Sequence, residues 1–213
     1  MTKPKIGFTP PKDWLSKKRV DEFSHSFEDL AKTRLPNLYL QLQTQINRAI
    51  PLLPFAEDGN GPATLLSDTA LSDHLKGLQD ALAEATRHTA SLKGSEVKKN
   101  NRDFAGVYVM VSGKRPFYVG ISRTAICRLR SHVRTLEHHT ASLLFNLLKN
   151  HTSHDGFRGD LDFTTEEAKG VQRWLRSQKV AILPLACPVE RYAFELYAAM
   201  KLKTGKWNTF ETH

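Results

Sequence analysis

Residues 106–132 read GVYVMVSGKRPFYVGISRTAICRLRSH, and two similar tripeptides stand out in them: GVY at 106–108 and YVG at 118–120. Valines and aromatic residues on both sides of a short polar segment predict two adjacent β-strands. The Ser-Gly-Lys-Arg-Pro segment at 112–116 contains the residues that turns prefer, so it predicts the loop of a hairpin. This hairpin is the most informative part of the sequence.

The loop at 112–116 sets the register of the hairpin. It pairs Val111 with Phe117 and places Tyr108 opposite Gly120. Opposite and alternate residues share a face, so the rings of Tyr108 and Tyr118 are expected on one side of the sheet. The other side, expected to be core, carries Val107, Val109, Val111, Phe117, Val119 and Ile121. Gly120 leaves room beside Tyr108 for a backbone or a phosphate.

A helix is predicted from about Arg123 to Glu137, because apolar residues recur there at three- and four-residue spacing. Arg128 and His132 are four residues apart, so they are neighbours on an adjacent face of that helix. A guanidinium and an imidazole beside two phenols can bind an oxyanion such as a phosphodiester. Spacing alone favours the alternative that Arg128 is a solvated charge and His132 a surface residue.

Positive charge is concentrated around the hairpin. The chain of 213 residues has a formal net charge of +9, and residues 98–134 contain nine Lys or Arg against a single Asp. Such a local excess suits a polyanionic partner such as nucleic acid, while a ribosomal, membrane-surface or merely basic protein can have the same net charge. The basic residues expected to contact substrate phosphates are Lys114, Arg115, Arg123 and Arg130.

The overall composition indicates a soluble globular protein with one sizeable core or two small ones. The only two cysteines, Cys127 and Cys187, lack metal-binding spacing and are expected to be reduced core thiols. No apolar stretch is long enough to span a bilayer, and no secretory signal is visible. A cytoplasmic location and no membrane partner are therefore expected.

The first hundred residues carry helical patterns of their own. One runs from about Val20 to Ile50 with an interruption at Pro36, and a second follows a cap at Ser67 or Asp68. A polar, basic segment at 93–103 then marks the expected boundary between a helical region, 1–100, and a second domain, 101–213. Targeting, DNA contact and dimerisation all remain open as roles for residues 1–100, so a homodimer is among the expected states.

Beyond the helix at 123–137, the sequence predicts helices near 140–149 and 164–178, a strand at 179–185 and a last helix at about 190–203. Two glutamates of the last helix are candidates for a functional carboxylate. Glu190 is more simply a first-turn residue that satisfies the helix dipole. Glu195 has the small residues Ala198 and Ala199 three and four positions later, and these leave space for an ion.

Six positions in order resemble the GIY-YIG nuclease superfamily over residues 102–213. They are Tyr108 in GVY, Tyr118 in YVG, Arg128, His132, Glu195 and Asn208. The family pattern places an asparagine about a dozen residues after the glutamate, so the resemblance favours Glu195 over Glu190. Valine replaces isoleucine in both tripeptides, a conservative change on the core face. The resemblance implies an α+β domain built on a small three-stranded antiparallel sheet flanked by helices.

The resemblance also implies a metal-dependent endonuclease that leaves 5′-phosphate and 3′-hydroxyl ends on double-stranded or branched DNA. Glu195 would hold one Mg²⁺ or Mn²⁺ ion. Tyr108 would act as general base toward water or relay its proton to His132, and nearby arginines are expected to lower its pKa for that task. Tyr118 and Arg128 would orient the scissile phosphate, and Asn208 would brace the site.

The main alternative from another class is a non-catalytic nucleic-acid-binding module on the same fold. A filled set of six positions argues against it, because a binding module has no need of the carboxylate. Among enzymes, a restriction-type nuclease, a repair or recombination nuclease, and a mobile-element or effector nuclease all remain open.

Overall fold

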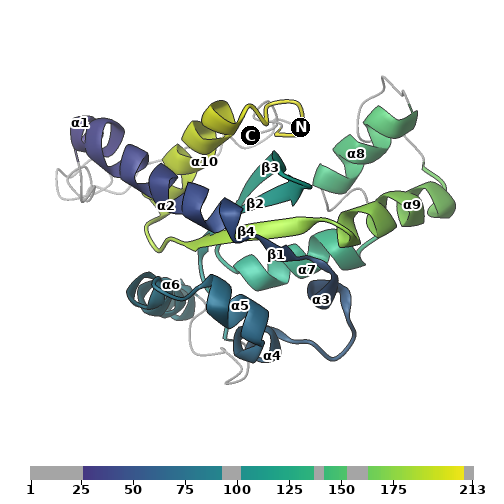
Figure 1. The fold of residues 1–213 in the computed structure, drawn as a ribbon, viewed down its shortest axis with the longest axis horizontal. Helices are drawn as coiled ribbons and strands as arrows, with labels where there is room; N and C mark the ends of the chain where they lie inside the picture. Colours follow the sequence, from purple (N-terminus) through teal and green to yellow (C-terminus); the bar gives the residue numbers. More distant parts are fainter. Residues whose placement is uncertain (1–25, 93–101, 137–141, 153–162, 209–213) are drawn as a thin grey trace, which may run out of the picture.

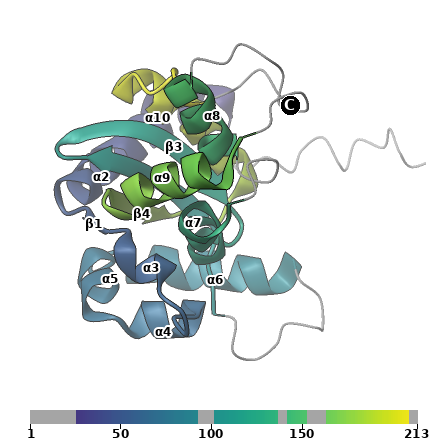
Figure 2. The same ribbon diagram turned by 90° about the vertical axis from the view of Figure 1, so that its right-hand side faces the viewer.

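The computed structural model of the chain describes residues 26–92, 102–136, 142–152 and 163–208. These residues form an α+β fold in which helices flank an open, four-stranded antiparallel sheet. Figure 1 shows α2 and α10 across one face of the sheet and α7 across the other, and Figure 2 shows the same layers edge-on.

The strands are arranged in the order β1 (Ile50–Pro51), β4 (Lys179–Pro184), β2 (Gly106–Ser112) and β3 (Arg115–Ser122). All three neighbouring pairs are antiparallel. The predicted three-stranded sheet is therefore wrong by one strand. The extra strand, β1, has only two residues inside a proline-rich stretch, so it has too short a pattern to recognise in the sequence.

The predicted register of the hairpin is confirmed at its centre. Tyr108 pairs with Gly120, and Met110 pairs with Tyr118. The register shifts at a β-bulge between Met110 and Val111. Because of this bulge, the loop is shorter than the predicted five-residue segment.

The predicted pair of Val111 with Phe117 is wrong, because the bulge pairs Val111 with Pro116. The turn itself uses Gly113 with a positive φ of 59°, a conformation that glycine adopts without a Cβ clash. Phe117 consequently packs against the tyrosine face, where its ring centroid lies 5.2 Å from that of Trp174.

Each face of the sheet is covered by a separate hydrophobic core. The tyrosine face, with Tyr108, Met110 and Tyr118, packs against α7, α8 and α9. The valine face packs against α2 and α10, and its strand residues are Val107, Val109, Val111, Val119, Ala181 and Leu183. The alternation predicted for β2 is thus confirmed, although both faces of the sheet are buried.

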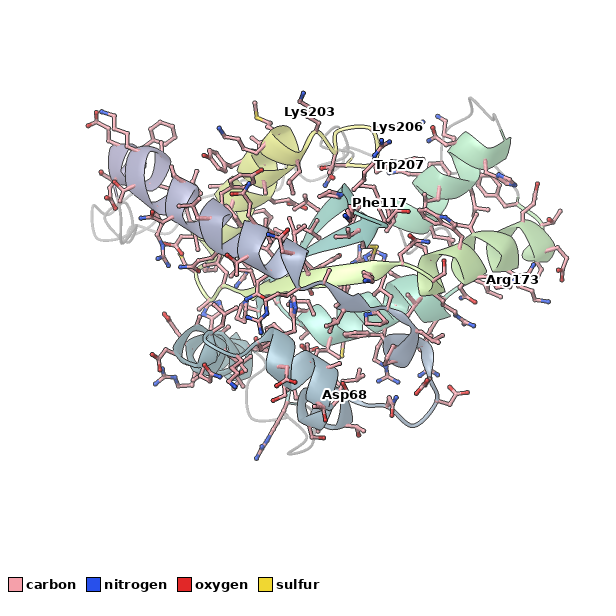
Figure 3. All side chains as sticks on the ribbon, in the orientation of Figure 1. Asp68, Phe117, Arg173, Lys203, Lys206 and Trp207 are labelled. Atoms are coloured by element: carbon pink, nitrogen blue, oxygen red, sulfur yellow. The ribbon has the colours of Figure 1, made fainter. Side chains whose placement is uncertain are left out.

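The helices of the amino-terminal region are α1 (Phe27–Asp29), α2 (Leu35–Asn47), α3 (Leu53–Ala56), α4 (Pro62–Ser67), α5 (Thr69–His74) and α6 (Gln79–Leu92). A π-helical segment, η2 (Leu30–Arg34), joins α1 to α2, so the helix continues past Pro36. Asp68, labelled in Figure 3, caps α5 by accepting from the Ala70 amide at 2.8 Å. Gly77, at a φ of 89°, lies between α5 and α6.

The carboxy-terminal helices are α7 (Ala125–Arg134), α8 (Ser142–Thr152), α9 (Thr165–Arg176) and α10 (Pro188–Leu202). They agree with the predicted elements to within a few residues. Among the described residues, no helix is long and apolar enough to cross a membrane. Cys127 and Cys187 are half-buried and form no disulfide within that part of the chain.

The amino-terminal region is packed into both cores. Strand β1 pairs with β4, α2 covers the valine face, and Leu71 and Ala85 join the core of the tyrosine face. Most of the predicted boundary segment lies at 93–101, outside the described residues. A division of labour between residues 1–100 and 101–213 stays a prediction, but the two regions share their hydrophobic cores.

Candidate active site

The site begins with a close contact between Tyr108 and Gly120 on neighbouring strands. A Cβ atom added to Gly120 would lie 2.5 Å from the hydroxyl oxygen of Tyr108. Any side chain at this position would therefore collide with the phenol ring. Glycine allows the ring of Tyr108 to lie across β3, and this ring occupies the room that the sequence predicted for a backbone or a phosphate.

Two further rings complete an aromatic cluster on the tyrosine face. The ring centroids of Tyr108 and Tyr118 are 6.2 Å apart, and that of His132 on α7 lies 5.7 Å from Tyr108 and 5.8 Å from Tyr118. All three side chains are buried. His132 is therefore part of the site, and its alternative interpretation as a surface residue is wrong.

The Tyr108 hydroxyl and His132 Nε2 are joined by a hydrogen bond of 2.8 Å. The Arg128 guanidinium, which can only donate, lies within interaction range of the Tyr108 hydroxyl. A phenol oxygen that accepts from Arg128 directs its own proton to Nε2. In that arrangement the neutral imidazole carries its proton on Nδ1, a buried atom that has no hydrogen-bond partner among the described residues.

Arg128 links the two phenols. Its side chain is half-buried and interacts with the hydroxyls of both Tyr108 and Tyr118. The position four residues before His132 on α7 brings the guanidinium and the imidazole to the same face, as predicted.

The protonation states of the site differ from the expectation. Burial raises the pKa of Tyr108 well above its ordinary value, with a further contribution from Tyr118, and Arg128 offsets this only in part. The predicted lowering of the Tyr108 pKa by arginines is therefore wrong. Burial, together with the charge of Arg128, lowers the pKa of His132 to about 3. Both groups are neutral near pH 7.

Glu195 reaches this cluster from α10, which packs against the edge strand β3. Its carboxylate interacts electrostatically with Tyr108 and Arg128. The side chain is half-buried and has no hydrogen bond or ion pair within the described part of the chain. Burial accordingly raises its pKa to about 7. A buried carboxylate without a donor is costly unless a cation accompanies it.

The metal-ligating side chains present suit a particular kind of cation. Among the described residues, no three His, Cys, Asp or Glu side chains come together in one place. A cage of the kind that holds calcium or zinc is thus missing from that part of the protein. Magnesium, in contrast, is commonly held by one or two carboxylates together with substrate phosphates. The carboxylate of Glu195, which accepts no hydrogen bond from the described residues, fits that second arrangement.

Asn208 holds the second tripeptide in place. Its Oδ1 accepts from the Val119 amide at 3.1 Å, and its Nδ2 donates to the Val119 carbonyl at 2.5 Å. Thr204 donates to the same Oδ1 at 2.9 Å. Asn208 is buried, and it anchors β3 between Tyr118 and Gly120. It therefore positions the site through the backbone.

The predicted phosphate-contacting residues fall in three places. Arg123 lines a pocket together with Arg128. Arg130 lies in a separate shallow pocket with Arg134. Lys114 and Arg115 are exposed at the hairpin tip, and Arg115 is about 17 Å from Gly120 at 3.4 Å per residue. Of these residues, only Arg123 is brought to the cluster.

Two residues near the site were missed in the sequence. Arg191 on α10 lines the same pocket as Arg123 and Arg128. Its position four residues before Glu195 is a signal that could have found it, because such residues share a helix face. Asp103 is buried and accepts from the amides of Ile126 and Cys127 at 3.0 and 2.9 Å, so it fixes the start of α7.

In chemical terms, the site offers the Tyr118 phenol and the Arg128 guanidinium as hydrogen-bond donors, the Tyr108–His132 pair that can pass a proton, and the Glu195 carboxylate, which accepts no hydrogen bond from the described residues. Such a set can bind a tetrahedral oxyanion and stabilise added negative charge. Comparison of the chain with protein-family models, with curated proteins and with solved structures finds no match to any of them.

Proposed function

We propose that this protein is a GIY-YIG-type DNA endonuclease that needs one Mg²⁺ or Mn²⁺ ion and leaves 5′-phosphate and 3′-hydroxyl ends. The observation that carries the proposal is the meeting of Tyr108, Tyr118, Arg128 and His132 with the half-buried carboxylate of Glu195. A purely structural cluster has no reason to leave a desolvated carboxylate without a donor. The proposed substrate, double-stranded or branched DNA, suits the positive charge around the hairpin.

The scissile phosphate would be held by donors that already converge. Arg128 reaches both phenols, so a phosphate that binds beside Tyr118 can accept hydrogen bonds from the guanidinium and from that hydroxyl. Phosphodiester hydrolysis places extra negative charge on the nonbridging oxygens in the transition state. Donors fixed before the reaction stabilise that charge without reorganisation.

Tyr108 and His132 would manage the proton of the attacking water. As the water oxygen bonds to phosphorus, its proton passes to the Tyr108 oxygen, and the phenol proton moves to His132 Nε2 over the 2.8 Å hydrogen bond. The P–O3′ bond breaks, and the 3′ oxygen takes a proton from solvent. The relay avoids a free tyrosinate, which the raised pKa of Tyr108 disfavours. The phosphate's negative charge favours the imidazolium that the relay forms.

Glu195 would hold the divalent ion against the substrate phosphate, where the ion supplies Lewis-acid stabilisation of the developing charge. The carboxylate must be ionised to do so. Its pKa of about 7 in the absence of a cation indicates that the ion and the proton compete for it.

The proposal is tested by incubating the purified protein with supercoiled, linear and branched DNA in Mg²⁺, in Mn²⁺ and in excess chelator. Nicking or cutting in either metal, absent in chelator and absent for Arg128→Ala, is the expected result. The ends are identified by ligation and by 5′-end labelling before and after phosphatase treatment. Undiminished cutting in chelator contradicts the proposal, as does cutting by Arg128→Ala at the wild-type rate.

Two observations favour the second candidate, a non-catalytic nucleic-acid-binding module. His132, with a pKa near 3, is a weak proton acceptor, and Tyr108 is almost wholly buried. Such a module would bind DNA in chelator and cut it in no metal. Binding without cutting of every DNA form, in both metals and from pH 6 to 9, would establish this candidate instead.

A further inference from the structure

A pocket of about 510 Å³ opens between the end of β3, the start of α7 and the first turn of α10. Its basic lining residues are Arg123, Arg128 and Arg191, and no acidic residue lines it. We call it the arginine pocket. Glu195 interacts with Arg128 from outside the pocket, but Arg123 and Arg191 have no carboxylate among the lining residues, so their positive charges repel each other.

Arg191 is held firmly in this pocket. The residue is buried, and its Nη1 donates to the carbonyls of Leu185 and Ala186 at 2.9 and 2.6 Å. Its Nε and Nη2 donate to no acceptor within the described part of the chain. The guanidinium is thus oriented by the backbone, while part of its fork is left for another acceptor.

Arg123 adds a second charge close to the first. Arg123 and Arg191 line the same pocket. Burial lowers the pKa of Arg191, Cys187 and Tyr192 act in the opposite direction, and the positive charge of Arg123 adds a smaller lowering contribution. Neither side chain makes an ion pair with a described carboxylate. Glu190, which is also on α10, forms its ion pair with Arg34 instead.

We infer that Arg123 and Arg191 form a second phosphate subsite, which binds one phosphodiester of the nucleic acid next to the one held by Arg128. The inference rests on the proposed function, because Arg128 in the same pocket is assigned there to the scissile phosphate. An anion between the two guanidinium groups would remove their repulsion and accept bidentate hydrogen bonds. Tyr192, an exposed aromatic residue on the rim, gives the pocket a surface for a sugar or base.

The test measures DNA affinity by fluorescence anisotropy in chelator, where cutting cannot interfere, over a series of salt concentrations. Each phosphate contact contributes about 0.9 to the slope of log K against log salt for duplex DNA. Arg123→Gln should reduce the slope by about one contact, and Arg191→Gln should do the same. The Arg123 side chain makes no hydrogen bond or ion pair with the described residues. The Arg123→Gln variant is therefore expected to fold even if Arg191→Gln does not.

The double variant distinguishes one shared phosphate from two separate ones. If both arginines hold the same phosphate, the double variant loses about one contact in all, like each single variant. A loss of about two contacts overturns the shared subsite, and so does a wild-type slope in both single variants. Arg173→Gln serves as the matched control, because this exposed arginine lies on α9, away from the arginine pocket, and should keep the wild-type slope.

Cutting assays separate this inference from the proposed function. Wild-type protein that cuts DNA, with single variants of unchanged slope, overturns only the subsite. Wild-type protein that binds but never cuts, with slopes reduced as expected, overturns the nuclease and supports the subsite. A wild-type protein that binds no DNA at all overturns both.

Discussion

Helix α10 carries two glutamates whose environments are opposite. Glu190 is buried and accepts two hydrogen bonds from Arg34, at 2.8 and 3.2 Å. Its negative charge is therefore balanced by an ion pair with η2. Glu195, five residues later and about 140° around the helix, faces Tyr108 and Arg128 instead. It has no donor in the described structure, and its pKa is raised to about 7.

The difference separates a carboxylate that stabilises the fold from one that is kept available. The Arg34–Glu190 pair ties η2 to the first turn of α10, and Glu190 also lies where the helix dipole favours an acid. Glu195 is held in a partly desolvated place that costs stability when it is ionised. Perturbed, unsatisfied carboxylates of this kind concentrate at functional sites.

The strongest way to break this comparison is to neutralise each glutamate in turn. Glu195→Gln is expected to lower single-turnover DNA cleavage about 10³-fold, the size typical of losing a major electrostatic contribution to the transition state. Glu190→Gln, the matched control on the same helix, should cut at close to the wild-type rate below its unfolding temperature. Equal losses in the two variants would mean that α10 has no functional face.

The second prediction concerns Tyr108, which interacts electrostatically with Glu195 in the cluster. Tyr108→Phe removes one oxygen and the hydrogen bond to His132, and it should reduce the cleavage rate by about 10²-fold or more, as expected for lost proton transfer. The fold should survive, because the ring still lies across Gly120. Circular dichroism and urea denaturation check this, and a Tyr108→Phe protein that cuts normally excludes the relay.

The third prediction concerns the contribution of Glu190 to the stability of the fold. Glu190→Gln leaves Arg34 without its carboxylate. We expect a loss of about 2 kcal/mol in the free energy of unfolding, less than the roughly 3 to 5 kcal/mol of a fully buried pair because Arg34 is partly exposed. Urea denaturation at pH 7 measures it. A loss within the error of the measurement would show that the ion pair contributes only as a surface pair does.

The smallest expected effect is a stability gain from Glu195→Gln. A carboxyl whose pKa rises from 4.5 to about 7 on folding stabilises the protein fully below the unfolded value, and this contribution is lost as pH rises through 7. In chelator, the variant should therefore gain on the order of 1 to 2 kcal/mol over wild type between pH 5 and pH 8, after allowance for solvent screening.

Thermal or urea denaturation at both pH values provides the measurement. The addition of Mg²⁺ with a non-cleavable DNA should reduce the difference in the free energy of unfolding between Glu195→Gln and wild type, because a bound cation favours the ionised carboxylate. A difference between variant and wild type that does not depend on pH would mean that Glu195 is ionised in the protein as it is in the unfolded chain.

Short-range pattern was enough for the hairpin and for the helices that follow it. Alternation in β2 and the spacing of Arg128 and His132 on α7 depend on periodicities of two and of about 3.6 residues, which the sequence displays directly. The preference for Glu195 over Glu190 came from a resemblance, and the structure supplies the physical difference between the two. The bulge at Met110 and Val111 was not visible, because a bulge changes pairing without changing composition.

The sequence by itself therefore determined most of the local elements and the order of the six candidate residues, but it predicted neither β1 nor the break between α5 and α6 at Gly77. The tertiary structure alone decided that β1 joins the sheet, that both faces are buried, that Arg191 enters the arginine pocket and that Arg130 leaves the site. It also decided the protonation states, because burial outweighs the neighbouring arginine in raising the Tyr108 pKa. The reason is the same in each case: desolvation and long-range packing depend on residues far apart in the chain, and no local pattern records them.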